Sequence, residues 1–230
     1  MKKSIFLISI ILIVDQVLKF WIKTNMTLGQ EIHVLGDWFI IHFTENSGMA
    51  FGLQFAGENG KLFLTLFRII AAMLIGIYIY QLNKREAHWL LIVSISLIFA
   101  GAVGNIIDSV FYGYLFSQST FFSTAEFLSK DGGYASLMHG RVVDMFYFPI
   151  IKSQYPSWFP WWGGQELIFF RPVFNIADSS ITIGAGVLIL FQKKFFHKKH
   201  VTIPDEKETS NEPATAELAN EKVENNDTMQ

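Results

Sequence analysis

The chain has 230 residues, of which 51% are hydrophobic and 17% charged, with a formal net charge of −2 and a mean hydropathy of +0.33. Soluble domains carry about 25% charged residues, so this composition argues against a soluble globule. No cysteine is present, which excludes disulfides, thiolate metal sites and a cysteine nucleophile.

Four stretches are apolar and long enough, at roughly 17 to 25 residues, to cross a bilayer as helices. They cover residues 4–22, 62–82, 89–107 and 176–196. The first could instead be a secretory signal peptide, since Lys2 and Lys3 precede it, but no small-residue cleavage site follows. The sequence therefore predicts an α-helical integral membrane protein with four transmembrane helices.

The basic residues predict the orientation of these spans, because cytoplasmic flanks of membrane proteins are enriched in Lys and Arg. Short flanks on one side hold Lys2, Lys3, Lys84, Arg85, Lys193, Lys194, Lys198 and Lys199. Both termini are therefore expected in the cytoplasm, with residues 24–61 and 108–175 on the outer face. Residues 1–200 form the membrane domain. Residues 201–230, with eight acidic residues and two lysines, are expected to be a disordered tail.

The two outer connections carry local signals of structure. Residues 38–43 are aromatic and β-branched and predict a strand of a small sheet, ended by a turn at Asn46-Ser47-Gly48. In the second connection, Ser123 and Glu126 have capping-box spacing and predict a short helix from Thr124. Its later part, residues 147–162, is rich in aromatic residues and proline and is expected to lie along the membrane interface.

A carboxylate within or at the edge of a membrane is expected to have a charge partner or a functional role, since inserting one costs roughly 2.5 to 3.5 kcal/mol on insertion scales. Asp15 and Lys19 are four residues apart on one helix face, which fits either a structural ion pair or a substrate contact. Asp108 lies at the end of the third span, where the helix dipole disfavours an anion. Arg141 and Arg171 are the candidate cations for Asp108.

Small and polar residues accompany Asp108 along the same span. Asn105 lies one turn before it and shares its face. Gly101 and Gly104 form a small face suited to close helix packing.

Two further carboxylates, Asp144 and Asp178, are expected at the same outer surface. Asp144 is surrounded by apolar residues, which raise the pKa of a carboxyl group. Asn175 can cap the fourth span and Asp178 then occupies its first turn, which is also what an ordinary helix start favours. As a pair, the two carboxylates could divide the work, with an ionised Asp178 accepting a proton from water and a protonated Asp144 stabilising the oxyanion.

Five blocks of the sequence, taken together and in this order, resemble the lipoprotein signal peptidase (signal peptidase II) family of membrane aspartyl peptidases. They are Asp15 with Lys19, residues 46–51 (Asn-Ser-Gly-Met-Ala-Phe), residues 104–108 (Gly-Asn-Ile-Ile-Asp), residues 142–144 (Val-Val-Asp) and residues 174–178 (Phe-Asn-Ile-Ala-Asp).

The resemblance implies that Asp144 and Asp178 are the catalytic dyad. The supporting or substrate-binding positions would be Asp15, Lys19, Asn46, Gly48, Asn105, Asp108 and Asn175, and we add Arg141 as the candidate partner of Asp108. A small periplasmic β-cradle beside the four helices is also implied.

The implied activity is removal of the signal peptide before a diacylglyceryl-modified cysteine, in the bacterial inner membrane and at its periplasmic face. We further expect a monomer that contacts membrane lipid, needs no cofactor or metal, binds no nucleic acid and is inhibited by globomycin.

The chain departs from the family pattern in three places. Ser109 stands where the family usually has Arg directly after the Asp of the Gly-Asn block. The connections from Asp108 to Asp144 and on to Asp178 are longer than in typical members. The acidic tail is an addition.

Other functions fit the sequence less well. A proton-coupled transporter or channel subunit would have carboxylates near mid-membrane and often repeated halves. A noncatalytic assembly factor would make Asp144 and Asp178 replaceable. A Ser/Lys peptidase using Ser179 or Ser180 has no evident lysine beside them, and His33 and His42 lack zinc-ligand spacing.

Overall fold

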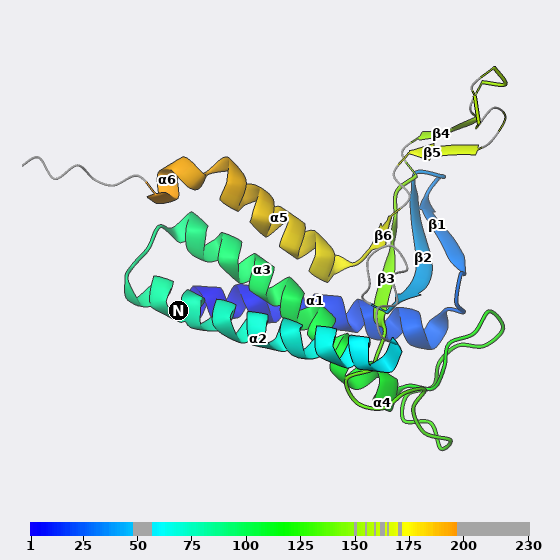
Figure 1. Cartoon of the computed structure of the whole chain (residues 1–230), viewed down its shortest axis with the longest axis horizontal. Coiled ribbons are helices and arrows are strands. Elements are labelled where there is room, and N and C mark those ends of the chain that lie inside the picture. The colour runs from blue at the N-terminus through cyan, green and yellow to red at the C-terminus, as the bar shows by residue number, and fades with distance from the viewer. Residues whose placement is uncertain are drawn as a thin grey trace, which may run out of the picture. The chain divides into compact units, whose positions relative to one another are not determined.

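The computed structural model describes residues 1–47, 57–149, 151–154, 156–158, 160–161, 164, 166–169 and 172–196. Its main elements are four apolar helices that run along one another (Figure 1), namely α1 (Lys2–Asn25), α2 (Gly57–Lys84), α3 (Trp89–Ile107) and α5 (Ile176–Leu190). The first three are long and apolar enough to cross a membrane. Gly48 and the tail after residue 196 lie outside the described residues.

The fourth predicted span, residues 176–196, is interrupted. Helix α5 has 15 residues and ends at Leu190, and after Phe191 the short helix α6 (Gln192–Phe196) follows. At about 1.5 Å per residue, α5 alone is shorter than a typical span.

Helix α1 has the burial pattern of a membrane helix, with polar residues inside and apolar residues outside. Its buried side chains include Ser4, Asp15, Lys19 and Lys23, whereas Phe6 is 68% exposed. This reverses the pattern of a soluble amphipathic helix, because the exposed surface of a membrane helix faces lipid.

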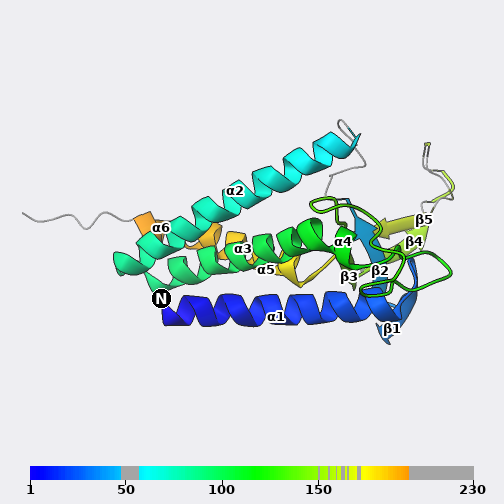
Figure 2. The same ribbon diagram turned by 90° about the horizontal axis from the view of Figure 1, so that it is seen from below.

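Helix α3 is the central helix of the bundle and packs against α5, α1 and α2. Glycine allows the closest approach: a Cβ atom on Gly101 would lie 2.2 Å from the carbonyl oxygen of Ala177 in α5, and one on Gly104 would lie 2.8 Å from a carboxylate oxygen of Asp15 in α1. The prediction that these two glycines serve helix packing is therefore confirmed. Figure 2 shows α2 diverging from α3 towards the end where the sheet lies.

An antiparallel sheet lies at that end of the helices, with strand order β1-β2-β3-β6. Its strands are β1 (Glu31–Leu35), β2 (Phe39–Asn46), β3 (Val142–Tyr147) and β6 (Val173–Phe174), and β4 (Ile151–Gln154) pairs with β5 (Glu166–Phe169) in a separate hairpin. The strand predicted at residues 38–43 is thus confirmed as part of β2. Register pairs Thr44 with Asp144.

Helix α3 continues into a π-helical turn, η2 (Asp108–Tyr112), and then α4 (Gly113–Leu115). π-turns of this kind often occur at functional sites. The helix predicted from Thr124 is wrong, because residues 123–126 are non-helical. The amide of Glu126 donates to the Ser117 hydroxyl instead of Ser123, and the Ser123 amide donates to Thr120, so the capping box does not form.

Candidate active site

The centre of the site is an ion cluster that joins α1 to the end of α3. The Lys19 ammonium lies 3.0 Å from a carboxylate oxygen of Asp15 and 2.8 Å from one of Asp108, and all three side chains are at most 1% exposed. Gln16 donates to the other Asp108 oxygen at 2.9 Å. Such a desolvated cluster persists only if its charged groups have partners; Lys19 contacts both carboxylates and Gln16 adds a hydrogen bond to Asp108.

The prediction that Arg141 is the cation beside Asp108 is therefore wrong, because Lys19 occupies that place. The other candidate, Arg171, lies outside the described residues. Lys19 reaches Asp108 because both lie on faces that α1 and α3 turn towards each other. Arg141 instead pairs with Glu45 of β2 at 3.2 Å and lies over the ring of Tyr134.

Two asparagines present their amide groups to the predicted dyad. The Asn105 carbonyl oxygen accepts a hydrogen bond from Lys19 at 2.9 Å, so its NH₂ group is directed to Asp178, 2.8 Å away. The Asn175 carbonyl oxygen accepts from the Asp178 amide, and its NH₂ group donates to Asp144 at 2.8 Å. Because an ammonium or an amide N–H can only donate, each contact fixes the orientation of its asparagine.

The capping prediction for α5 is confirmed. Asn175 is its N-cap, and Asp178 completes a capping box by accepting from the Asn175 amide. The ordinary role of a helix start and a role in the site are therefore combined in the same side chains. The fold positions Asp178 further through Asp15, which accepts from the backbone amide of Ala177 at 3.0 Å.

Asp144 is 4% exposed on β3, and its protonation is shifted. Burial, with the charge of Asp178 adding to it, raises the pKa of Asp144 to about 7, although Lys19 and hydrogen bonds from Asn175 and Asn46 oppose the shift. Near neutral pH, the Asp144 carboxyl is thus able to carry a proton.

A second buried ion cluster ties α1 to the sheet and was missed by sequence reasoning. Lys23, one turn after Lys19, pairs with Glu45 and donates to the Ser119 hydroxyl at 3.0 Å. Glu45 also holds Arg141, so this cluster fixes the start of β3 just before Asp144. Its sequence signal was the continued spacing of four residues from Asp15 through Lys19 to Lys23.

The other residues singled out from the sequence lie as follows. Ser109 is buried and donates to the Asn105 backbone carbonyl. Ser179 and Ser180 donate to the carbonyls of Asn175 and Leu97. Both His33 and His42 lie near Glu31 on the sheet, and within the described residues no group of three or more His, Asp or Glu side chains is arranged to hold a metal.

Buried carboxylates, asparagines and a lysine at one end of apolar helices define a membrane protein with a buried polar site. A sequence model of the family described as signal peptidase (SPase) II matches residues 7–194. The chain belongs to this family and is a peptidase of a bacterial membrane.

Relatives of known name agree with this assignment. The chain is similar to the lipoprotein signal peptidase of Porphyromonas gingivalis, with 53% identity over 188 residues and 80% of each chain covered. It is 40% identical to that of Amoebophilus asiaticus over 182 residues, covering 77% of this chain and 72% of the relative. A bacterial membrane enzyme solved by the in meso method at 2.3 Å resolution matches with a TM-score of 0.56 and 27% identity, covering 86% of this chain and 93% of that one.

Proposed function

We propose that this chain removes the signal peptide from diacylglyceryl-modified bacterial prolipoproteins, cutting before the lipidated cysteine with water activated between Asp144 and Asp178. The observation that carries this proposal is the shared support of the two carboxylates. Asn175 donates to Asp144 and also caps the helix that bears Asp178, so the pair is held as one unit.

In the proposed reaction, Asp178 is the ionised member and accepts a proton from water as the water oxygen attacks the scissile carbonyl carbon. Asp144, protonated because burial raises its pKa to about 7, donates to the carbonyl oxygen and stabilises the tetrahedral intermediate. Collapse of the intermediate returns that proton to Asp144, while Asp178 passes its proton to the leaving amine. Both carboxyl groups end as they began.

The neighbouring polar residues support this chemistry without taking part in bond making. Lys19 forms ion pairs with Asp15 and Asp108 and fixes Asn105, whose NH₂ group directs the Asp178 carboxylate. Asp108 accepts from the backbone amide of Val143 at 3.2 Å, which holds the residue before Asp144. Asn46 adds a hydrogen bond to Asp144.

The setting of the proposed reaction follows from the charge distribution and the family. The site would lie at the periplasmic face of the inner membrane, with both termini in the cytoplasm, so that the lipid of the substrate stays in the bilayer while water reaches the peptide. We propose a monomer that needs no metal and binds globomycin.

Substitution of the two carboxyl groups tests the function. Asp144→Asn and Asp178→Asn keep side-chain shape but remove proton exchange, so each should lower cleavage of a lipidated prolipoprotein by at least the roughly 10²- to 10⁴-fold typical of acid–base catalysis. The double variant should lose little more, because residues that act as a unit are not additive. The measurement is mass analysis of the product released by purified protein in detergent.

Asp37→Asn is the matched control, because the Asp37 side chain is 83% exposed in the connection between β1 and β2. It should cleave at the wild-type rate. Thermal stability in detergent separates folding defects from catalytic ones. Near wild-type cleavage by either dyad variant would remove that residue from the mechanism.

A further inference from the structure

A cavity of about 540 Å³ lies where α1 and α3 begin and α2 ends. Figure 1 shows this end of the helices, marked N, on the far side from the sheet, so the cavity is separate from Asp144 and Asp178. Leu7 of α1 and Ile92 of α3 give it apolar walls. Its volume falls within the roughly 300 to 1,000 Å³ of small-molecule sites, so it is large enough to hold a substantial part of a ligand.

The Ser96 hydroxyl lines this cavity without a hydrogen-bond partner. Ser96 is fully buried, and among the described residues it has the one buried side-chain polar atom that makes no hydrogen bond. Ser94, on the same helix and also buried, donates instead to the Leu90 carbonyl oxygen at 2.8 Å, a common arrangement for a serine in an apolar helix. Because an unpaired buried hydroxyl costs free energy, Ser96 indicates that an occupant of the cavity supplies its partner.

The other uncharged polar side chains of the cavity are already paired. Ser4 of α1 and Asn83 of α2 each donate a hydrogen bond to the other at 3.3 Å, and Asn83 also donates to the Ile79 carbonyl oxygen at 2.9 Å. This leaves Ser96 alone, whereas a buried water needs roughly two to four polar partners. A ligand that combines a hydrogen-bond acceptor with an apolar part fits the cavity better.

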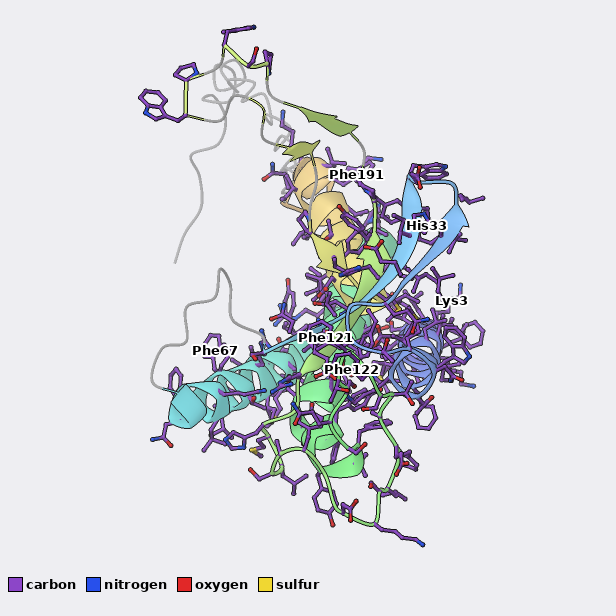
Figure 3. The ribbon with its side chains drawn as sticks, turned by 90° about the vertical axis from the view of Figure 1, so that its right-hand side faces the viewer. Lys3, His33, Phe67, Phe121, Phe122 and Phe191 are labelled. Atoms are coloured by element: carbon purple, nitrogen blue, oxygen red, sulfur yellow. The ribbon has the colours of Figure 1, made fainter. Side chains whose placement is uncertain are left out.

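The charges at this end of the helices favour a negatively charged ligand. Lys2 and Lys3 line the cavity and are exposed, and Lys3 is labelled on α1 in Figure 3. None of the described residues that line the cavity is acidic. Both α1 and α3 begin here without an acidic residue in the first turn, and no side chain caps α1. The free amide groups and the dipoles of helix N-termini add to the attraction for an anion.

The position of the cavity along α3 matches the polar part of a bilayer. Trp89, at the start of α3, lines the cavity and is 67% exposed, and tryptophans at the ends of membrane helices lie at the level of the lipid headgroups. Ser96 lies about 10 Å further along the helix, since each residue adds ~1.5 Å. The unpaired hydroxyl is therefore below the headgroups, where the ester groups and acyl chains of a lipid begin.

We propose that this cavity binds an anionic glycerophospholipid of the membrane leaflet at this end of the helices. The lipid phosphate pairs with Lys2 and Lys3. An ester carbonyl oxygen accepts a hydrogen bond from Ser96, and an acyl chain lies along Leu7 and Ile92. The inference does not depend on the proposed function, because the cavity and the dyad lie at opposite ends of the helices.

Native mass spectrometry of the full chain in neutral detergent tests the site, with phosphatidylglycerol and phosphatidylcholine of the same acyl chains as probes. The wild-type protein should bind phosphatidylglycerol roughly tenfold or more tightly than phosphatidylcholine, because two lysines face a net negative charge only in the first lipid. Lys2→Gln with Lys3→Gln should remove this preference. Ser96→Ala loses one hydrogen bond and should weaken phosphatidylglycerol binding by roughly threefold to tenfold.

Two matched controls leave the cavity unchanged. Ser94→Ala removes a hydroxyl from the same helix that is bonded elsewhere, and Lys193→Gln with Lys194→Gln removes two exposed charges of α6 that do not line the cavity. Both should bind phosphatidylglycerol as the wild type does. Equal losses in the Ser94→Ala and Ser96→Ala variants would contradict a specific bond to Ser96.

Val93→Phe tests the cavity without changing a charge or a hydroxyl, because Val93 lines it and a larger side chain fills it. This variant should lose the tightly bound phosphatidylglycerol, with its thermal stability in detergent measured alongside. If it does not fold, the lysine and Ser96 variants decide the question. Equal binding of the two lipids by the wild-type protein, or wild-type binding by a folded Val93→Phe variant, would overturn the inference and leave the proposed function untouched.

Discussion

At the scale of single residues, the site depends on asparagine side chains that accept a hydrogen bond with the amide oxygen and donate one with the amide nitrogen. Asn175 accepts from the Asp178 amide with its oxygen and donates to Asp144 with its nitrogen. Asn105 likewise connects Lys19 to Asp178. Replacing either asparagine by aspartate would therefore remove a donor and also add a charge beside Asp144 and Asp178.

The raised pKa of Asp144 has a consequence for stability. Its carboxyl titrates near pH 7 in the folded protein but near 3.9 in an unfolded chain. The stabilising contribution of this group is therefore complete below pH 4 and is lost as the pH rises to about 7, by up to about 1.4 kcal/mol per pH unit. Because asparagine does not titrate, the melting temperature of Asp144→Asn relative to wild type should increase between pH 4 and 7.

Thermal unfolding in detergent across this pH range measures the effect. Asp37→Asn, which replaces an exposed carboxyl, should show a nearly constant difference from wild type. A pH-independent difference for Asp144→Asn would mean that burial does not perturb its protonation in the folded protein.

Sequence reasoning found most of the residues that meet at the site, because polar groups in apolar spans are few and their helical spacing is visible. Spacing alone placed Asp15 with Lys19 on one helix face and Asn105 with Asp108 on a face of another helix. Its two candidate cations for Asp108, Arg141 and Arg171, left out Lys19, because the contact of Lys19 with Asp108 depends on how α1 packs on α3. Gln16 and Glu45 were missed because a single polar residue at a helix edge or in a strand gives no periodic signal.

At the scale of elements, the close packing of α3 on α5 determines where Asp178 lies. A Cβ atom on Gly101 would lie 2.2 Å from the Ala177 carbonyl oxygen and 2.7 Å from Ile181, so the helices must separate to admit it. Gly101→Ala should destabilise the protein by roughly 1 to 3 kcal/mol, the usual cost of overpacking, and should lower cleavage because Ala177 precedes Asp178.

Gly186→Ala in α5 is the matched control for this prediction, because nothing lies within 4 Å of an added Cβ there. That variant should match or exceed wild-type thermal stability, since alanine favours a helix over glycine. Equal stability of the Gly101→Ala and Gly186→Ala variants would contradict the packing argument.

The length of the apolar stretches located three helices well, but it extended the fourth span through Phe191, where the chain leaves the helix. Residues 176–196 are apolar along most of their length, so composition alone gives no stop signal. The helix predicted from Thr124 does not form, although in this case the sequence did carry a local signal. Its local capping signal was present, but hydrogen bonds to Thr120 and Ser117 were formed instead.

At the scale of the whole membrane unit, Met1–Phe196, the protein keeps its ions inside and its large apolar side chains outside. Lys19, Lys23 and Asp108 are fully buried, whereas Phe63 is 73% exposed and Leu74 63% exposed. This distribution is stable only where lipid covers the outer surface. The sheet lies at the end of the helices where α3 ends and α5 begins (Figure 1), and Asn105, Asp144 and Asp178 meet there. The orientation of the helices therefore decides which side of the membrane carries the site.

That orientation can be measured directly, because the chain has no cysteine of its own. Asp37→Cys puts one thiol between β1 and β2 at the sheet end, and Gln192→Cys puts one in α6 beside the basic residues Lys193 and Lys194. Basic flanks remain in the cytoplasm. In intact spheroplasts a membrane-impermeant maleimide should therefore label the Asp37→Cys variant and leave Gln192→Cys unlabelled, and inverted membrane vesicles should give the reverse. Labelling of Gln192→Cys in intact spheroplasts would place the sheet end, and with it Asp144, in the cytoplasm, where an exported prolipoprotein could not be cut on the outer face.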